Sequence, residues 1–571
     1  MDSNSVRTEP NIRTGAQILM DVLKEHGVNT IFGYPGGAVI DIYDELSRTD
    51  IRHVLVRHEQ AAVHAADGYA RASGRIGVCL VTSGPGATNT VTGIASAYMD
   101  SIPIVVITGQ VPTHLIGNDA FQEVDIVGIT RPCTKHNYLV KRVEDLARIL
   151  REAFYIAKSG RPGPVLVDIP KDVVKARTSF QPGEPVCLKT YNPTYHPNSR
   201  QLEKVVHLIR EARRPLIFAG GGVILSKAAA ELTQLARSLQ IPVTTSLMGM
   251  GAFPGSDPLA LGMIGMHGTY AANMATSHCD LLLAVGVRFD DRVTGKTDAF
   301  AAQAQIVHID IDPTSIRKNV LVTVPLVGDC RITLSHLNRL TASEIPSDLS
   351  ERRQEWFDRI ECWRRKGALR YEQHDVIKPQ YVIETLYRLT QGKAIITTEV
   401  GQNQMWAAQY YTFDEPDHFL TSGGLGCMGY GLPAAIGAQM ARPDRLVVDV
   451  AGDGSIQMNS QEFATAVQYG LPVKVVILNN RYLGMVRQWQ ELFYDKRYAS
   501  TDMSHTPDFV KLAEAYGADG FRATRPEEVE SVLEAGLKSR RVAVMDFWVD
   551  REECVYPMVP AGAPITEMLL V

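Results

Sequence analysis

The amino-acid sequence predicts an α/β protein built from three doubly wound domains with mainly parallel sheets. Short β-rich apolar runs that end in Gly or Pro alternate with helix-like periodic segments over most of the chain, as in βαβ units. The chain has 571 residues, which is far more than one hydrophobic core normally serves. A Pro-rich polar stretch at residues 181–198 and a charged stretch at 341–377 divide the pattern into three blocks.

The first block covers residues 12–180. We expect helices at GAQILMDVLKEHG and QAAVHAADGYARASG, where apolar residues recur at helical spacing. The expected strands are NTIFGYPGG, IGVCLVTSGPG, IPIVVITGQ and GPVLVDIP. We expect residues 181–198 to form a linker.

The second block covers residues 199–340 and the third covers 378–550. The strands expected in the second block are RPLIFAGGG, IPVTTS, DLLLAVGVRF and AQIVHIDID. Those expected in the third are KAIITTEVG, RLVVDVAGDG, VKVVILNN and VAVMDFWV. A helical connection at 341–377 joins the two blocks. The apolar, Pro-rich tail at 551–571 is expected to pack over a site or a partner.

The first and third blocks share a turn-forming sequence. It is Thr82-Ser83-Gly84 in the first block and Thr421-Ser422-Gly423 in the third. We interpret these blocks as two related α/β domains that flank a different middle domain.

Composition excludes several classes of protein. The net charge of −5 gives no sign of the excess of basic residues that is typical of nucleic-acid-binding proteins. The 8 cysteines are scattered without a CxxC pair, so neither a zinc site nor a disulfide framework is expected, and a reducing cytoplasm fits. The polar first residues lack the apolar core of a signal peptide, and no apolar run approaches the roughly 18 residues of a membrane span. We therefore expect a cytoplasmic protein that is not in a membrane.

Polar oxygen ligands follow two of the strands expected in the third block. Asp453 lies between Gly452 and Gly454, and Asn480 follows 27 positions later (480 − 453) at the end of the next strand. The carboxyl ends of parallel strands are where α/β sheets bind ligands. One carboxylate with amide and backbone oxygens suits Mg²⁺, while Gly454 and Ser455 allow a phosphate to approach the following helix. The alternative is that both pairs are ordinary turn formers.

The combination of these strand ends resembles the thiamine-diphosphate-dependent 2-oxoacid enzymes, and within them the catalytic large subunits of the acetohydroxyacid synthase (acetolactate synthase) family. The resemblance covers about residues 12–565. It rests on FGYPGGAVIDIYD, RHEQAAVHAADGYAR, TSGPGATN, TGQVP, DAFQEVDI, RPGPVLVDIPKD, GMHG, GVRFDDRVTG, TSGGLGCMGYGLPAAIGA, GDGS and NNRYLGMVRQWQELFY. Together these motifs are highly specific, although most would be weak alone.

The resemblance implies a pyrimidine-binding first domain, a flavin-binding second domain and a diphosphate-binding third domain. Asp453, Asn480 and the Tyr482 carbonyl would hold Mg²⁺, and Gly401 and Gln402 would contact the diphosphate. Thiamine diphosphate would lie between the first domain of one chain and the third of another. The implied assembly is a homodimer or tetramer with a small regulatory subunit.

The resemblance also implies a transferase. It would decarboxylate pyruvate and transfer the two-carbon unit to a second pyruvate or to 2-oxobutyrate, the first common step of branched-chain amino-acid biosynthesis. Glu59 would hydrogen-bond N1′ of the cofactor's aminopyrimidine and promote loss of the C2 proton. Met428 would be the apolar wedge that folds the cofactor. The alternatives are an exposed or helix-capping glutamate and a core methionine.

Five further positions match family residues around the substrates. Phe121, Gln122 and Lys171 would line the entrance. Arg292 and Trp489 would face the second substrate, since arginine binds carboxylates bidentately and an aromatic wall favours 2-oxobutyrate through its extra methylene. Their alternatives are a loop, a solvated lysine, a surface ion pair and core packing.

The flavin has the least support from the residues themselves, because Gly220-Gly221-Gly222 is not a GxGxxG motif. An acid at a strand end, such as Asp310, could bind a ribose hydroxyl. The resemblance implies a structural FAD, because the net reaction needs no redox change. Its contacts would be Arg161, Gly220, Met266, His267, Gly268, Val287, Arg288, Asp310 and Asp329.

The chain departs from the family at Glu399, where several members carry Gly or Asp. We expect contacts near the diphosphate to differ there without a change of activity. Two other functions remain open: a related thiamine enzyme, such as a pyruvate oxidase or a decarboxylase, and a non-catalytic cofactor-binding or regulatory protein. The RFDDR and MVRQWQELFY stretches favour the synthase, and the intact Glu59, Asp453 and Asn480 argue against a non-catalytic role.

Overall fold

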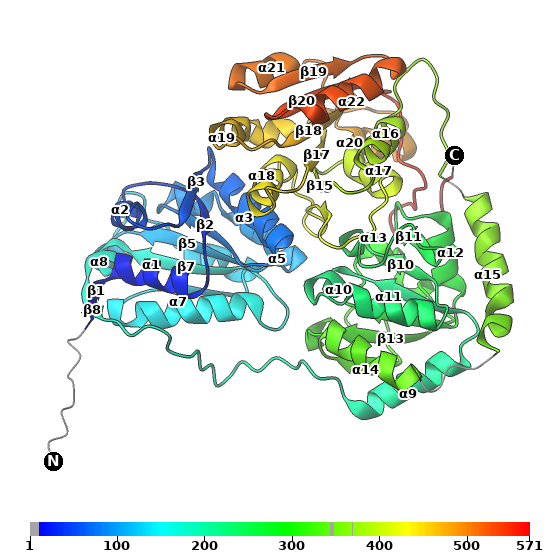
Figure 1. The fold of residues 1–571 in the computed structure, drawn as a ribbon, viewed down its shortest axis with the longest axis horizontal. Coiled ribbons are helices and arrows are strands. Elements are labelled where there is room, and N and C mark those ends of the chain that lie inside the picture. The colour runs from blue at the N-terminus through cyan, green and yellow to red at the C-terminus, as the bar shows by residue number, and fades with distance from the viewer. Residues whose placement is uncertain (1–10, 343–347, 368, 571) are drawn as a thin grey trace. The chain divides into compact units, whose positions relative to one another are not determined.

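The computed structural model describes residues 11–342, 348–367 and 369–570 (Figure 1). The chain divides into two compact units. The first runs to Asn192 and also contains Ile436–Arg442 and Ala464–Tyr469, while the second contains the remainder. The first unit holds one large sheet and the second unit holds two.

The sheet of the first unit has six parallel strands. In spatial order they are β3 (Arg52–Leu55), β2 (Thr30–Tyr34), β4 (Gly77–Val81), β5 (Ile104–Gln110), β7 (Val165–Pro170) and β6 (His136–Leu139). A separate antiparallel pair joins β1 (Ile12–Thr14) to β8 (Arg177–Ser179).

Helices cover both faces of this sheet. On one face lie α1 (Gly15–Glu25), α2 (Ile40–Leu46), α7 (Val143–Lys158) and α8 (Lys171–Lys175). On the other lie α3 (Glu59–Ser73), α5 (Val91–Asp100) and α6 (Ile126–Thr130). Val105 and Ile107 of β5 point into the first core, and Ile104 and Val106 point into the second. Burial on both faces explains why the strands read as continuous apolar runs.

The middle sheet has a different strand order. Its six parallel strands are β11 (Ala260–Met263), β10 (Val243–Thr245), β9 (Pro215–Ala219), β12 (Leu281–Val285), β13 (Gln305–Asp310) and β14 (Val324–Val327). Counted from β9, this is the 3-2-1-4-5-6 order of dinucleotide-binding folds, with its switch point between β9 and β12.

The helices of the middle sheet again form two layers. One face packs against α9 (Ser199–Glu211), α10 (Gly221–Leu225), α11 (Ala229–Ser238) and α14 (Cys330–Ala342). The other packs against α12 (Tyr270–His278) and α15 (Leu349–Lys366). The predicted helical connection is therefore a layer of the middle domain from Leu349 onward, and its residues 343–347 and 368 lie outside the described residues.

The third sheet repeats the order of the first. Its parallel strands are β16 (Phe419–Leu420), β15 (Ile395–Thr398), β17 (Val447–Gly452), β18 (Lys474–Asn479), β20 (Ala543–Trp548) and β19 (Asp519–Ala523). One face packs against α16 (Pro379–Thr390), α17 (Gln402–Tyr410) and α22 (Val529–Lys538). The chain between and after these strands also forms α18 (Gly431–Ala441), α19 (Phe463–Gln468), α20 (Gly484–Phe493) and α21 (Phe509–Tyr516), and most of α18 and α19 belongs to the first unit. The shared order confirms two related domains and a different middle one.

The predicted linker has neither helix nor strand up to Ser199, where α9 begins. All 8 cysteines are free thiols. Among the residues that the structure describes, no helix has the length and apolar character needed to cross a membrane.

Arg353 fixes α15 to the middle domain although it is a charged residue with no exposed surface. Its guanidinium donates to the carbonyl of Ile209 at 3.1 Å and to that of Leu239, which lie at the ends of α9 and α11. The carbonyls at helix ends lack partners within the helix and carry partial negative charge. Arg353 therefore caps two helices at once.

We expect Arg353→Met to lower the free energy of unfolding by about 3 kcal/mol, because it leaves buried carbonyls without donors. Urea denaturation measured by circular dichroism tests this. Arg352→Met is the matched control, since Arg352 bonds the Arg210 carbonyl at an exposed position on the same helix. Equal losses in the two variants would contradict the capping role.

Candidate functional site

The two predicted ligand positions lie side by side at the carboxyl ends of β17 and β18. These strands are parallel neighbours, with Gly452 opposite Leu478. Asp453 is 1% exposed and Asn480 is 4% exposed. The backbone N–H groups of Asn480 and Arg481 interact with the Asp453 carboxylate, so the two strand ends are in contact.

The Asp453 carboxylate has an unused oxygen. Its Oδ2 is buried and has no hydrogen-bond partner among the described residues. Burial raises the pKa of Asp453 to about 7, and the Asp546 carboxylate adds to the rise. An ionised carboxylate without a partner is costly inside a protein. The donor set of one carboxylate, one amide oxygen and a backbone carbonyl fits a hard divalent cation that would offset this cost.

A chain of amides orients Asn480. Its Nδ2 donates to Gln402 Oε1 at 2.9 Å, and Gln402 Nε2 donates to Gln488 Oε1 at 2.9 Å. Because the amide nitrogen faces Gln402, the Oδ1 atom faces the other way, where it accepts the Tyr482 N–H at 3.1 Å. One lone pair of Oδ1 remains for a further partner.

The carboxyl-terminal tail contacts this chain. Gln402 Nε2 donates to the Glu553 carbonyl at 3.0 Å, and Gln488 exchanges two hydrogen bonds with the backbone of Val555. The tail then reaches the middle domain, where the N–H of Val559 donates to the Met266 carbonyl at 2.8 Å. The prediction that the tail packs over a site is consistent with these contacts.

The turn after β17 brings Met428 near Gly454. A Cβ on Gly454 would lie 2.7 Å from Leu483 Cδ2 and 3.9 Å from Met428 Cε. The absence of a side chain at Gly454 therefore leaves room for these two side chains. Ser455 is buried, and its hydroxyl donates to the Gly452 carbonyl at 3.2 Å. The helix expected after Ser455 is a short 3-10 helix (Ile456–Glu462) that continues into α19.

The other predicted diphosphate contacts follow β15, the neighbour of β17 on its other side. Gly401 precedes α17, and Gln402 is its first residue. Asn403 Nδ2 donates to the carbonyls of Glu399 at 3.0 Å and Val450 at 2.8 Å, which ties the ends of β15 and β17 together. Sequence reasoning missed Asn403, which follows the predicted Gln402, and Gln488, which lies beside Trp489 in the stretch NNRYLGMVRQWQELFY.

Arg292 and Trp489 meet although 197 positions separate them (489 − 292). The Arg292 guanidinium lies 5.6 Å from the Trp489 ring centroid, and 58% of the Arg292 side chain is exposed. Trp489 Nε1 is buried and has no hydrogen-bond partner in the described part of the chain. The positive charge of Arg292 thus lies over the Trp489 ring, whose own N–H donor has no partner in the described residues.

The first unit contains four of the predicted catalytic residues. Glu59 begins α3 half-buried, and its Oε2 accepts from Asn89 Nδ2 at 2.9 Å. Gln122 has φ of 61° and packs against Gly84 of the Thr82-Ser83-Gly84 turn. Phe121 is 88% exposed. Lys171 lies at the start of α8, directly after β7.

The predicted flavin residues of the second unit surround the middle sheet's carboxyl edge. Gly220 and Val287 follow β9 and β12 at the switch point, and a Cβ on Gly220 would lie 2.3 Å from the Gly286 oxygen. Asp310 ends β13, and the Arg288 carbonyl accepts from Asn319 Nδ2 at 3.2 Å. Glycines at both strand ends allow the close packing that a nucleotide crevice needs.

Some predicted flavin residues have structural contacts. Met266 N–H donates to the Arg292 carbonyl at 2.7 Å, and Gly268 N–H donates to Gly265. His267 is paired with the Pro557 carbonyl at 3.2 Å, and burial lowers its pKa to about 4, so it is neutral. Asp329 accepts the Ile332 N–H at 3.0 Å at the start of α14. In the first unit, Arg161 Nε donates to Ser101 Oγ at 2.8 Å.

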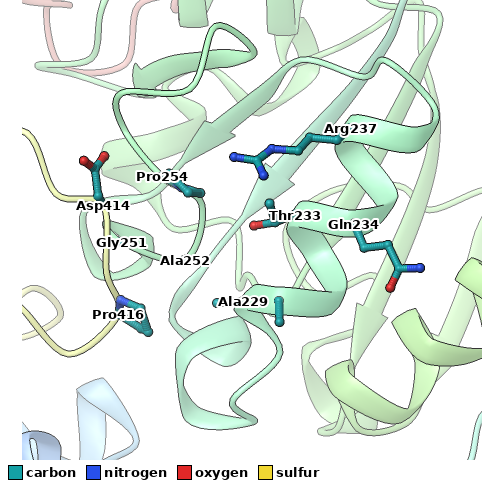
Figure 2. A pocket seen from close by; sticks show the side chains of 10 residues that line it. Ala229, Thr233, Gln234, Arg237, Gly251, Ala252, Pro254, Asp414 and Pro416 are labelled. Atoms are coloured by element: carbon teal, nitrogen blue, oxygen red, sulfur yellow. The ribbon is translucent and has the colours of Figure 1, made fainter.

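A separate open pocket of about 410 Å³ lies in the second unit (Figure 2). Thr233, Gln234 and Arg237 of α11 line one side, and Asp414 and Pro416 lie across from them. Arg237 is paired with Asp257, and Asp414 accepts the Ser256 N–H. None of the predicted site residues lines this pocket.

Family models for thiamine pyrophosphate enzymes match three parts of the chain. The N-terminal TPP-binding domain matches residues 13–129, the central domain 202–337, and the C-terminal TPP-binding domain 399–547. These segments contain Glu59, the middle sheet, and Asp453 with Asn480, respectively.

Curated relatives match over nearly the whole chain. The acetolactate synthase isozyme 3 large subunit of Escherichia coli K12 is 52% identical over 98% of each chain. The acetolactate synthase large subunit of Haemophilus influenzae is 49% identical over 98% of each. That of Parasynechococcus marenigrum is 50% identical over 100% of this chain and 92% of the relative. The chain therefore belongs to the acetolactate synthase large-subunit family of the thiamine pyrophosphate enzymes.

Proposed function

We propose that this chain is the catalytic large subunit of an acetolactate synthase. It decarboxylates pyruvate and transfers the two-carbon unit to a second pyruvate, giving 2-acetolactate, or to 2-oxobutyrate, giving 2-aceto-2-hydroxybutyrate. The observation that carries the proposal is the buried, unpartnered Asp453 oxygen beside Asn480 at two adjacent strand ends. Related thiamine enzymes and binding proteins are the competing functions.

Asp453, Asn480 and the Tyr482 carbonyl would hold Mg²⁺ for binding of the diphosphate. Gly401, Gln402, Gly454 and Ser455 lie where the diphosphate approaches, and Met428 supplies the apolar wedge near Gly454. When bound, thiamine diphosphate supplies the carbon nucleophile that decarboxylation requires. The role of the protein is to orient this group and to control one proton.

Glu59 controls that proton through a hydrogen bond to the aminopyrimidine. Two copies of the chain complete each site, with Glu59 of one copy facing the diphosphate residues of the other. The half-exposed Glu59 and the 88% exposed Phe121 support cover by a second copy. Gln122 and Lys171 complete this side of the entrance.

The middle domain binds FAD in a structural role. The support is the dinucleotide-type strand order with glycines at the β9/β12 switch point. Gly220, Met266, His267, Gly268, Val287, Arg288, Asp310, Asp329 and Arg161 are its proposed contacts. His267 and Asp329 also have the structural contacts described above, so they act as anchors for the tail and for α14.

Arg292 and Trp489 bind the second 2-oxoacid. The exposed guanidinium offers bidentate hydrogen bonds to the substrate carboxylate. The aromatic wall adds contact with the extra methylene of 2-oxobutyrate, which is typically worth about 1–3 kcal/mol.

We also propose a domain organisation, a partner subunit and a cellular location for the chain. The domains are 12–180, 199–340 and 378–550, joined by the linker at 181–198 and the connection at 341–377 and followed by the tail at 551–571. A small regulatory partner is proposed because the relatives are named large subunits. The free cysteines support a cytoplasmic location.

One assay separates the proposed function from its competitors. The protein is incubated with pyruvate, Mg²⁺, thiamine diphosphate and FAD, with and without 2-oxobutyrate. Acetolactate, converted by acid to acetoin, supports the synthase. Acetaldehyde alone indicates a decarboxylase, acetyl phosphate with peroxide indicates an oxidase, and no turnover indicates a binding protein.

We expect Asp453→Ala to weaken retention of Mg²⁺ and thiamine diphosphate by at least about 100-fold, because even residues that only support metal ligands contribute about 10- to 100-fold. Isothermal titration after dialysis against a chelator measures this. Asp414→Ala, in the pocket of Figure 2, is the matched control. Unchanged retention in Asp453→Ala would remove this residue from the metal site.

We expect Glu59→Gln to slow exchange of the cofactor C2 proton with deuterium oxide by about 100-fold or more, the usual contribution of a positioned acid or base. Quenched-flow NMR measures the rate. The affinity for Mg²⁺ and thiamine diphosphate should change little, since the proposed contacts of the metal and the diphosphate, Asp453 and Asn480 among them, stay intact. Near-normal exchange defeats the assignment.

Mixing the two inactive variants tests the shared site. If two copies complete each site, Glu59→Gln and Asp453→Ala chains reassembled together regain partial activity, because one site per hybrid dimer has both intact residues. Absence of recovery in hybrids shown to form by mass spectrometry would mean that each chain builds its own site.

We expect Trp489→Leu to reduce the preference for 2-oxobutyrate over pyruvate by about tenfold, because the aromatic wall that contacts the extra methylene is lost. The ratio of the two products at equal substrate concentrations measures this. Phe493→Leu is the control, since Phe493 packs edge-on against Trp489 on the same helix. An unchanged ratio in Trp489→Leu would place the acceptor elsewhere.

A further inference from the structure

The turn that carries Met428 is rich in glycine. Gly426 and Gly429 adopt positive φ angles of 75° and 86° on either side of Met428. Glycines give a turn many alternative conformations, so a side chain held only by such a turn is poorly fixed. A wedge that must meet its target within a fraction of an ångström needs another restraint.

Glu399 supplies one restraint. It directly follows β15 and has no exposed surface. Its Oε2 accepts the Gly429 N–H at 2.6 Å, and its Oε1 accepts the Leu432 N–H at 3.2 Å. The N–H groups of Tyr430 and Gly431 also stabilise the carboxylate. The carboxylate thus occupies the amino end of α18, where a negative charge is favourable.

Asn459 supplies a second restraint on the same residue. Its Nδ2 donates to the Gly429 carbonyl at 2.6 Å, and its side chain is 1% exposed. Asn459 lies in the 3-10 helix that follows the Gly452–Gly454 turn. Gly429 is therefore held by its N–H from the end of β15 and by its carbonyl from the segment after β17.

The neighbouring Asp449 determines where the charge of this region lies. Burial raises the pKa of Glu399 to about 7, and burial together with the neighbouring Glu399 raises the pKa of Asp449 well above its ordinary value. Asp449 Oδ1 accepts from Thr397 Oγ1 at 3.2 Å, while its Oδ2 has no partner in the described residues. Two adjacent buried carboxyls do not both ionise, so the charge lies on Glu399, which has the backbone donors.

We propose that Glu399, with Asn459 opposite it, is a positioning residue that clamps Gly429 and thereby aims the Met428 side chain at the thiamine-diphosphate site. The inference rests on the proposed function, because Met428 needs aiming only if it contacts the cofactor. Glu399 itself touches no reacting atom. It acts through its hydrogen bond to the backbone of Gly429, the residue that follows Met428.

The first test uses the protein before any cofactor is added. Amide hydrogen exchange is followed by mass spectrometry in peptides that cover residues 427–432. In Glu399→Gln, whose side-chain amide replaces one acceptor by a donor, protection there falls by about tenfold, the value of one hydrogen bond. Glu528→Gln is the matched control, because Glu528 also accepts backbone N–H groups, from Thr524 and Arg525, away from the site. In that variant only peptides around 524–528 change.

The second test uses the enzyme loaded with Mg²⁺ and thiamine diphosphate. In Glu399→Gln, C2 proton exchange slows by about 10- to 100-fold, the usual effect of a 1 Å misplacement. The affinity for thiamine diphosphate changes little, since the metal ligands remain intact. Glu399→Asp keeps the charge on a shorter side chain and restores part of the rate.

A double-mutant cycle separates positioning from general stability. If Glu399 acts through Met428, then Glu399→Gln has no further effect on C2 exchange in a Met428→Ala background. Multiplicative losses overturn the inference. So does a wild-type exchange rate in Glu399→Gln while residues 427–432 have lost protection.

The outcomes also distinguish this inference from the proposed function. Failure of the unaltered protein to bind thiamine diphosphate overturns both. Normal binding and C2 exchange in the unaltered protein and in Glu399→Gln overturns only the inference. If Glu399→Gln does not fold, Glu399→Asp and Asn459→Ala are measured in the same cycle, where the same multiplicative losses overturn the inference.

Discussion

The parallel pairing of β17 with β18 determines the rest of the site. Because Gly452 lies opposite Leu478, the residues that follow both strands emerge at one edge of the sheet. Asp453 and Asn480 therefore become neighbours although they lie far apart in the sequence. The amide chain through Gln402 and Gln488 then orients Asn480, and the turn at Gly454 leaves room for Met428. A shift of the pairing by one residue would turn the side chains of one strand to the opposite face and separate Asp453 from Asn480.

The inner strands of all three sheets could be predicted from the sequence, whereas the edge strands could not. β5, with the sequence IVVITGQ, is buried along its whole length and begins with four consecutive apolar residues. The edge strands β6 (HNYL) and β19 (DGFRA) are only partly buried, and β16 has only 2 residues. An edge strand needs one neighbour and no continuous apolar core, so its sequence resembles a loop. The same strand order in the first and third sheets agrees with the turn that both blocks share.

The candidate site also contains some residues that could be predicted from the sequence and others that could not. Strand-end chemistry was enough to place Asp453 and Asn480, and the family resemblance identified Arg292 and Trp489, which the fold brings together. The clamp on Gly429 could not be predicted, because its partner Glu399 lies 30 positions away and ends a different strand. Hydrogen bonds from side chains to backbone leave no periodicity in a sequence. Gln488 was missed for the same reason, since a buried glutamine on an amphipathic helix resembles its solvated neighbours.

The tail has a practical consequence for handling the protein. Its backbone is bonded to Gln402 and Gln488 near one end and to the Met266 stretch farther on, and Leu569 pairs back onto Met558. The carboxyl-terminal segment is thus hydrogen-bonded within the same unit that contains Asp453 and Asn480. An affinity tag or fluorescent fusion appended there would pull on residues that orient Asn480. The first described strand, β1, pairs instead with β8 in the first unit, so an addition on the amino-terminal side leaves the contacts of the tail intact.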